Sequence, residues 1–197
     1  MYDYRRWTHE QRRQIVQQRH DRGFPLHRPP HLDTGSGWYI ITVATFEHKH
    51  HFGEANELTA LTVRLLEETT RGGFPVSGWV VLPNHYHLLV RLDHPKVIAP
   101  YLGRVHGRSS RYANLRDHTQ GRQVCYRFSD RKIRSERHFW TCLHYIMINP
   151  VKHKHVEEMS QWPWSCFHEV LMEHGQAWIN NLQWEYPLLD FGKGWDD

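Results

Sequence analysis

Two histidines stand inside the stretch WVVLPNHYHLLVRL (79–92), whose aromatic and β-branched residues favour a buried strand. Side chains at i and i+2 of a strand point to one face, so His85 and His87 lie about 6.5–7 Å apart there, and Tyr86 points to the opposite face. Two imidazoles at this spacing can bind one metal ion. The alternative is a solvent-facing or hydrogen-bonded pair, because the chain contains 18 histidines.

A second polar pair lies in SERHFWTCLHYIMINP (135–150), which predicts a helix that Pro150 ends. Tyr145 and Asn149 are four residues apart and share one face of that helix. They form a polar stripe among apolar neighbours. A phenol with an unperturbed pKa of about 10 can act as nucleophile and as leaving group. The alternative is a buried ring whose hydroxyl only makes a hydrogen bond.

The predicted elements alternate in a recognisable order. Strands are expected at 38–46, 76–82, 86–92 and 124–130, and helices at 54–73, 96–106 and 135–150, with a basic loop after residue 106. The order β-α-β-β-α-β followed by a helix predicts an α+β, ferredoxin-like (split βαβ) fold, an antiparallel sheet with helices on one face. The other face is then open for a ligand or for the last helix.

Three regions are expected along the chain. Residues 1–37 form a basic N-terminal arm with a short helix around 8–21, residues 38–168 form the domain, and residues 169–197 form a tail packed on it. In WPWS (162–165), packing is expected, with Trp162 and Trp164 fixing the tail to the domain.

The 197 residues carry a formal charge of +4, with 25 Lys and Arg, which favours a polyanionic partner. Cations are dense between 104 and 137, and aromatic side chains lie among them, as single-stranded nucleic acid requires. The alternative is an ordinary charged surface over a core of aromatic residues. The residues expected to bind DNA are Arg104, Arg108, Arg111, Tyr112, Arg122, Arg127, Arg131, Lys132 and Arg134. Arg5, Arg6, Arg12 and Arg13 of the arm are weaker candidates for the same contact.

The cysteines and the lack of long apolar segments indicate the cellular compartment. Cys125, Cys142 and Cys166 form no CxxC pair and are expected to be reduced thiols. The N-terminus has no apolar segment typical of a secretory signal, and no apolar stretch approaches a membrane span. A cytoplasmic protein is expected, with no membrane partner.

The motifs together resemble one family. LPNHYHLLV resembles the His-hydrophobic-His motif of the HUH endonucleases, and HYIMINPVKHKHV with WPWS resembles the tyrosine helix of the REP-associated tyrosine transposases. The resemblance covers residues 38–168. The family usually has glycine after NPVKH, where this chain has Lys154.

The resemblance implies a bacterial, nucleoid-associated enzyme that cleaves and rejoins hairpin-bearing (REP-like) single-stranded DNA. His85 and His87 match the metal-binding pair, Asn149 the third ligand and Tyr145 the nucleophile. The implied cofactor is a divalent metal ion, Mg²⁺ or Mn²⁺, and the implied intermediate is a 5′-phosphotyrosine. A monomer or homodimer is expected, with the monomer favoured.

Three alternatives remain open at this stage. The first is a domesticated, non-catalytic DNA-binding protein on the same fold. The second is an RNA-binding module of the same sheet topology, and the third is a protein with a structural zinc site. The RNA-binding module would need exposed aromatics on the central strands, where this chain has histidines. The zinc site lacks a nearby cysteine.

Overall fold

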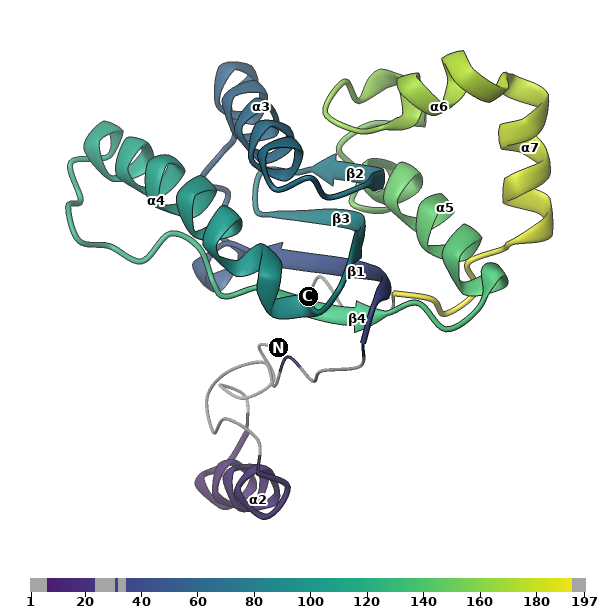
Figure 1. The fold of residues 1–197 in the computed structure, drawn as a ribbon. Coiled ribbons are helices and arrows are strands. Elements are labelled where there is room, and N and C mark those ends of the chain that lie inside the picture. Colours follow the sequence, from purple (N-terminus) through teal and green to yellow (C-terminus); the bar gives the residue numbers. More distant parts are fainter. Residues whose placement is uncertain (1–6, 24–30, 32–34, 193–197) are drawn as a thin grey trace.

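A four-stranded antiparallel sheet forms the centre of the protein (Figure 1). The computed structural model describes residues 7–23, 31 and 35–192. The strands follow the spatial order β2-β3-β1-β4. Their bounds are β1 Gly37–Ala44, β2 Val76–Val81, β3 His85–Leu92 and β4 Ser129–Lys132. With helices joining β1 to β2 and β3 to β4, this order matches the predicted split βαβ arrangement.

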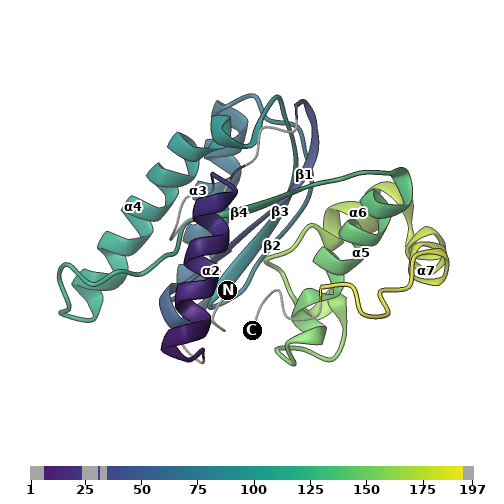
Figure 2. The same ribbon diagram turned by 90° about the horizontal axis from the view of Figure 1, so that it is seen from below.

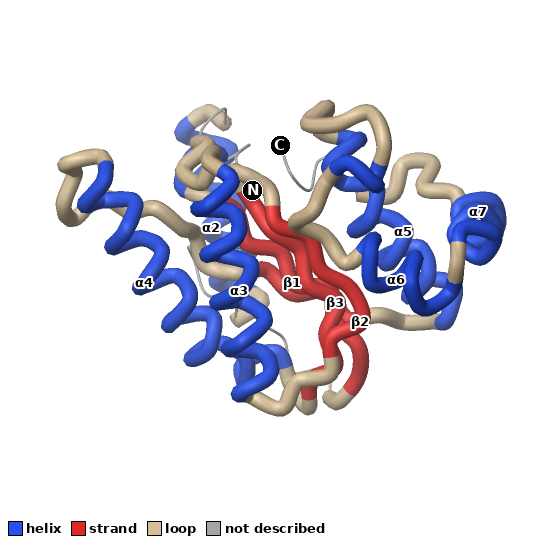
Figure 3. The backbone as a smooth tube through the Cα atoms, turned by 90° about the horizontal axis from the view of Figure 1, so that it is seen from above, coloured by secondary structure: helices blue, strands red, loops and turns tan. Residues whose placement is uncertain are grey.

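Helices cover the sheet from both sides (Figures 2 and 3). Helices α3 and α4 lie on one face, as predicted. Helix α5 lies against the other face, with α6 and α7 packed beside it. The face that the sequence leaves open is therefore occupied by the last helices. Their bounds are α3 Ala55–Arg71, α4 Ala99–Arg116, α5 Glu136–Lys152, α6 Phe167–His174 and α7 Gln176–Glu185, and short 3₁₀ turns span Phe46–His48, Pro95–Ile98 and Met159–Gln161.

The arm contains the predicted helix, α2 (His9–Asp21). Its first turn is closed by a capping box between Thr8 and Gln11. None of its residues is buried, and it stands apart from the sheet in Figure 1. Arg5 and Arg6 lie outside the described residues.

Helix α4 is longer than expected. The segment 107–116 continues the helix, and its prediction as a loop is wrong. Gly107 and the two serines suggest a loop, but Ser109 and Ala113 are buried on the packing side. Small residues let α3 and α4 approach closely, so beyond Val105 the buried face of α4 shows none of the large apolar residues that mark a helix in sequence.

Two further element ends differ from prediction. Helix α5 continues through Pro150 to Lys152, since the missing amide removes one bond while the His153 amide still bonds the Asn149 carbonyl at 3.0 Å. Strand β4 begins at Ser129 and not at 124. Residues before it make only an isolated bridge between Cys125 and Thr45.

The contact between α5 and the sheet depends on a missing side chain. A Cβ at Gly78 of β2 would lie 2.9 Å from the Leu143 Cδ1 of α5, so glycine allows the close approach. The outer edge of β2 is covered by the WPWS segment. Trp162 Nε1 donates to the Val81 carbonyl at 3.0 Å, and the Val81 amide donates to the Trp164 carbonyl at 2.9 Å. The two tryptophans thus pack as predicted.

Candidate functional site

The histidine pair opens strand β3, on the face covered by α5. His85 and His87 are both buried, and their ring centroids lie 5.1 Å apart. Tyr86 points the other way, and its hydroxyl lies 2.8 Å from His106 Nε2 on α4. The i, i+2 geometry expected from the sequence is therefore present, and the pair is not solvent-facing.

Helix α5 brings Tyr145 and Asn149 onto this pair. The Tyr145 ring lies 5.2 Å from the His87 ring, and Asn149 Oδ1 lies 3.0 Å from His85 Nε2. The helix starts at Ser135, whose hydroxyl accepts from the His138 amide. The four residues singled out from the sequence therefore meet at one place, although β3 and α5 are more than 40 residues apart.

The donor set fits a divalent cation. Two imidazoles and a carboxamide oxygen are neutral ligands, so they leave the charge of a bound ion undiminished. Ligands about 2.1 Å from an ion and at right angles are about 3.0 Å apart, the separation between His85 Nε2 and Asn149 Oδ1. Across the described residues, no group of three or more His, Cys, Asp or Glu side chains is arranged to hold a metal. Asn149 would be the third ligand beside the two imidazoles.

A C-terminal segment covers the tyrosine. Tyr145 is fully buried, and Phe191 lies against its ring with centroids 5.6 Å apart. Gly192 approaches the same ring so closely that a Cβ there would lie 2.8 Å from Cζ. Lys152 Nζ donates to the Gly192 carbonyl at 3.1 Å and lies 4.7 Å from the ring centroid. This segment therefore encloses the Tyr145 ring and helps to keep it from solvent.

Two neighbours of the site are absent from the sequence-based set. The His153 ring lies 4.8 Å from the His85 ring. It stands four residues after Asn149, so the stripe of Tyr145 and Asn149 continues by one turn, and that spacing could have identified it. Thr42 Oγ1 lies 2.9 Å from His87 Nδ1. It comes from β1, and nothing local in the sequence marks it.

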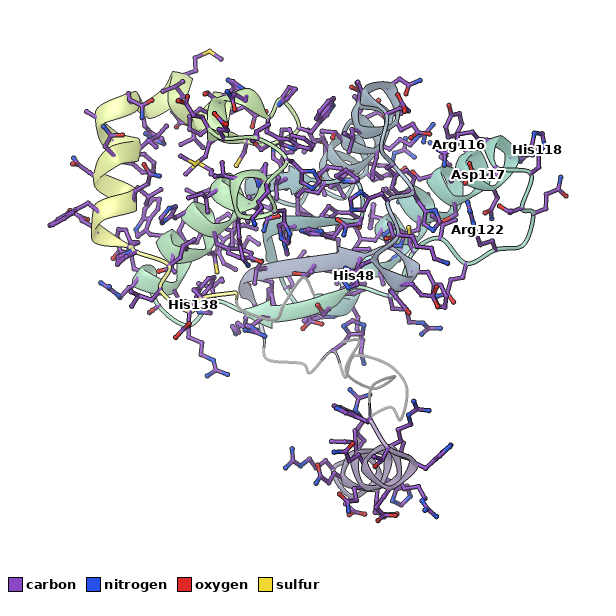
Figure 4. The ribbon with its side chains drawn as sticks, turned by 180° about the vertical axis from the view of Figure 1, so that it is seen from behind. His48, Arg116, Asp117, His118, Arg122 and His138 are labelled. Carbon is purple, nitrogen blue, oxygen red and sulfur yellow. The ribbon has the colours of Figure 1, made fainter. Side chains whose placement is uncertain are left out.

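Several of the expected DNA-binding residues lie far from this cluster. Helix α4 carries Arg104, Arg108, Arg111 and Tyr112, on the opposite face of the sheet. Arg104 Nε donates to Glu68 at 2.7 Å. Arg122 Nη2 pairs with Asp117 at 2.7 Å, at the end of α4 remote from His138 (Figure 4). The structure does not bring these residues together with the histidine pair.

Hydrogen bonds from Arg116 and Arg122 depress the pKa of the Asp117 carboxyl well below its usual range. Arg116 also pairs with Glu57 of α3. These contacts tie the end of α4 to its neighbours, which gives Arg122 a structural partner.

Strand β4 carries cations on the face of α5. Arg131 pairs with Ile40, and Ile40 pairs with Leu89, two residues beyond His87, so Arg131 projects from the histidine face. Desolvation lowers the pKa of its guanidinium, whereas Cys142 and Tyr145 act electrostatically to raise it. Arg131 therefore lies near Cys142 and Tyr145 of α5.

Other expected cations lie close to Arg131 in the sequence. Arg134 is exposed, and its amide donates to His138 Nδ1 at 3.2 Å. Desolvation lowers the pKa of His138, and Arg131 and Arg134 lower it further. Arg127 is also exposed, and Lys132 Nζ donates to the Gly35 carbonyl at 3.3 Å.

Among the described residues, no helix is long and apolar enough to cross a bilayer. No family model matches the sequence.

Known proteins nevertheless resemble this chain. The REP-associated tyrosine transposase of Escherichia coli K12 is 30% identical over 126 residues, which are 61% of this chain and 68% of that protein. A Haemophilus influenzae protein named for the same family is 32% identical over 106 residues, 48% of this chain and 60% of the relative. A solved structure of a REP-associated tyrosine transposase bound to a REP hairpin has the same fold, with a TM-score of 0.58, 22% identity, and coverage of 76% of this chain and 87% of that one. On the identity and coverage of the E. coli relative, this chain belongs to the family of REP-associated tyrosine transposases.

Proposed function

We propose that this transposase cleaves and rejoins hairpin-bearing single-stranded DNA through a covalent 5′-phosphotyrosine at Tyr145. The observation that carries the proposal is the meeting of α5 and β3. Tyr145 lies against His87, and Asn149, one turn later, bonds His85. A nucleophile and three neutral ligands thus converge from two elements.

In the cleavage step, the phenolic oxygen attacks phosphorus, the bond from phosphorus to the 3′ oxygen breaks, and that oxygen leaves as a 3′-hydroxyl. The phosphotyrosine conserves the energy of the broken bond, so a 3′-hydroxyl can later displace the tyrosine without ATP. Strand transfer, and not plain hydrolysis, is the expected outcome.

His85, His87 and Asn149 would hold the divalent cation, Mg²⁺ or Mn²⁺. When bound, the ion supplies positive charge that polarises the phosphate. The three side chains contribute by being neutral and fixed. Both rings are buried, and Asn149 is held by the helix that also carries Tyr145.

The DNA is proposed to approach from the β4 side of the site. Arg131 projects from the histidine face, and Arg127 and Arg134 are exposed near it. Backbone contacts from such cations supply most of the affinity for nucleic acid. The related structure bound to a REP hairpin supports a hairpin as the ligand class. Arg104 and Arg122 have structural partners, so we assign them a smaller part in DNA binding.

One chain supplies the entire cluster, because α5 packs on the sheet of its own chain. We therefore propose a monomer as the working unit. A dimer that exchanges α5 is not needed to complete the site.

A labelled hairpin oligonucleotide incubated with the protein and Mn²⁺ or Mg²⁺ tests the proposal on a denaturing gel. Wild type should form a covalent protein–DNA band, and Tyr145→Phe should form none. Phenylalanine retains the ring that packs on His87 and Phe191, so the variant removes only the hydroxyl. A band that persists in this variant would remove Tyr145 from the mechanism.

A second function is a DNA-binding protein without turnover. The observation that favours it is the full burial of Tyr145 under Phe191 and Gly192. This alternative predicts hairpin binding with no covalent band under either metal, also after the covering segment is displaced.

A further inference from the structure

Both imidazoles of the site are held at the same ring atom. His85 Nδ1 lies 2.8 Å from Asn84 Oδ1, and His87 Nδ1 lies 2.9 Å from Thr42 Oγ1. The Nε2 atom of His85 faces α5, where Asn149 Oδ1 lies 3.0 Å away. Each ring thus has a protein oxygen at Nδ1, and the Nε2 atom of His85 faces Asn149 Oδ1, the atom that would be its fellow ligand on a bound ion.

The two residues that carry these oxygens are held in place by the backbone. Thr42 stands directly opposite His87 in the antiparallel register of β1 and β3, so the two side chains share a face. Asn84 is held through its carbonyl, which accepts from the Thr45 amide at 2.8 Å and from Thr45 Oγ1 at 3.1 Å. Thr45 is buried at the end of β1. Strand β1 therefore secures both contacts.

We propose that Asn84 and Thr42 are positioning residues that fix His85 and His87 in the Nδ1–H tautomer with Nε2 directed to the metal. This inference rests on the proposed metal-dependent function. With an ion bound, Nδ1–H of each ring would donate to the oxygen, and the Nε2 lone pair would be directed to the ion.

The chemistry of the two acceptors suits this task. A carboxamide oxygen and a hydroxyl accept the N–H without carrying a charge, so they orient the ring and leave the charge of the ion undiminished. Outer contacts of this kind commonly contribute about 10–100-fold to metal affinity. Residues that only build the sheet and its turn would have no such effect.

Substitutions at Thr42 and Asn84 distinguish a role in orienting the histidine rings from a role in building the sheet and its turn. Thr42→Val keeps the branched shape and removes the acceptor, whereas Thr42→Ser restores it. Asn84→Ala removes the acceptor oxygen, whereas Asn84→Asp keeps one. The matched control is Thr62→Val on α3, a buried threonine whose hydroxyl has no hydrogen-bond partner within the described structure.

The first measurement is Mn²⁺ titration without DNA, followed by the loss of the free-ion electron paramagnetic resonance signal. We expect Thr42→Val and Asn84→Ala to raise the Kd for Mn²⁺ about 10–100-fold. We expect Thr42→Ser, Asn84→Asp and the Thr62→Val control to bind Mn²⁺ about as tightly as wild type or more tightly. An unchanged Kd in folded Thr42→Val and Asn84→Ala would overturn the proposal.

The second measurement is made on wild type, and variants are needed only to assign the histidine signals. Long-range ¹H–¹⁵N correlation spectra of the metal-free protein at pH 8 distinguish the two neutral tautomers. We expect His87 as Nδ1–H, and an Nε2–H tautomer for this ring would overturn the proposal; His85 is left out of this test because Asn149 Oδ1 can accept from its Nε2–H when no ion is bound. Wild type that binds no Mn²⁺ but shows His87 as Nδ1–H would contradict the metal chemistry of the proposed function and leave the orientation of the His87 ring intact.

Discussion

Replacing Gly192 by alanine should uncover the tyrosine. Gly192 has a φ of +75°, and its added Cβ would lie 2.8 Å from Tyr145 Cζ. The left-handed backbone costs a non-glycine residue about 1–2 kcal/mol, and overpacking costs about 1–3 kcal/mol. The segment is held mainly by the Lys152 bond, about 1.5–3 kcal/mol, and by the partly buried Phe191 ring. The strain and overpacking that alanine would introduce are therefore comparable in energy to the contacts that hold the covering segment in place.

The clash should displace the covering segment and not Tyr145, because Tyr145 lies in the middle of a packed helix and Gly192 lies outside any helix. A net loss of about 2 kcal/mol raises the open population about 30-fold. Chemical modification of Tyr145, followed by mass spectrometry, should accelerate by a similar factor, and covalent adduct formation should rise with it.

The matched control is Gly121→Ala. Gly121 has a φ of +82°, and a Cβ there would meet no atom within 4 Å. This variant has the backbone strain without the clash, so Tyr145 should remain protected. Equal protection of Tyr145 in folded Gly192→Ala would refute the view that this segment controls access.

Further predictions concern the ligands, the cations and pH. His85→Ala should abolish the covalent band but change hairpin affinity less than about threefold, since Lys and Arg side chains on the DNA phosphates supply most of the affinity. A large loss of affinity in a binding assay would contradict this. Arg131→Gln should weaken hairpin binding. Arg104→Gln should leave hairpin binding unchanged and lower the free energy of unfolding by about 1–2 kcal/mol in urea, because buried Glu68 loses a partner. Burial lowers the pKa of His106 to about 4 from 6.5, so the unfolded chain binds the proton more tightly. Its contribution to stability is complete above pH 6.5, and up to about 3 kcal/mol is lost as the pH falls towards 4. His106→Asn should flatten that slope.

Local periodicity was sufficient for much of the site. The alternation of a strand places His85 and His87 on one face, and helical spacing places Tyr145 and Asn149 on another. The order of the elements left the face of the histidine pair open for a ligand or for the last helix, and the structure places α5 there. These features depend on short stretches of sequence, so they are predictable from it.

The rest depends on contacts between distant segments. Thr42 reaches His87 through the register of two strands, and Phe191 reaches Tyr145 through the path of the tail. The length of α4 was missed because the second half of its packing face uses Ser109 and Ala113 in place of large apolar residues. Patterns within one element do not carry this information.

The most direct test of the covalent mechanism is to identify the residue that carries the DNA. Trypsin cleaves after Arg137 and Lys152, and the peptide 138–152 contains Tyr145 as its sole tyrosine. After reaction with a hairpin oligonucleotide and nuclease digestion, mass spectrometry should find this peptide with a nucleotide attached to Tyr145 through its 5′ phosphate. An adduct on another residue would contradict the account.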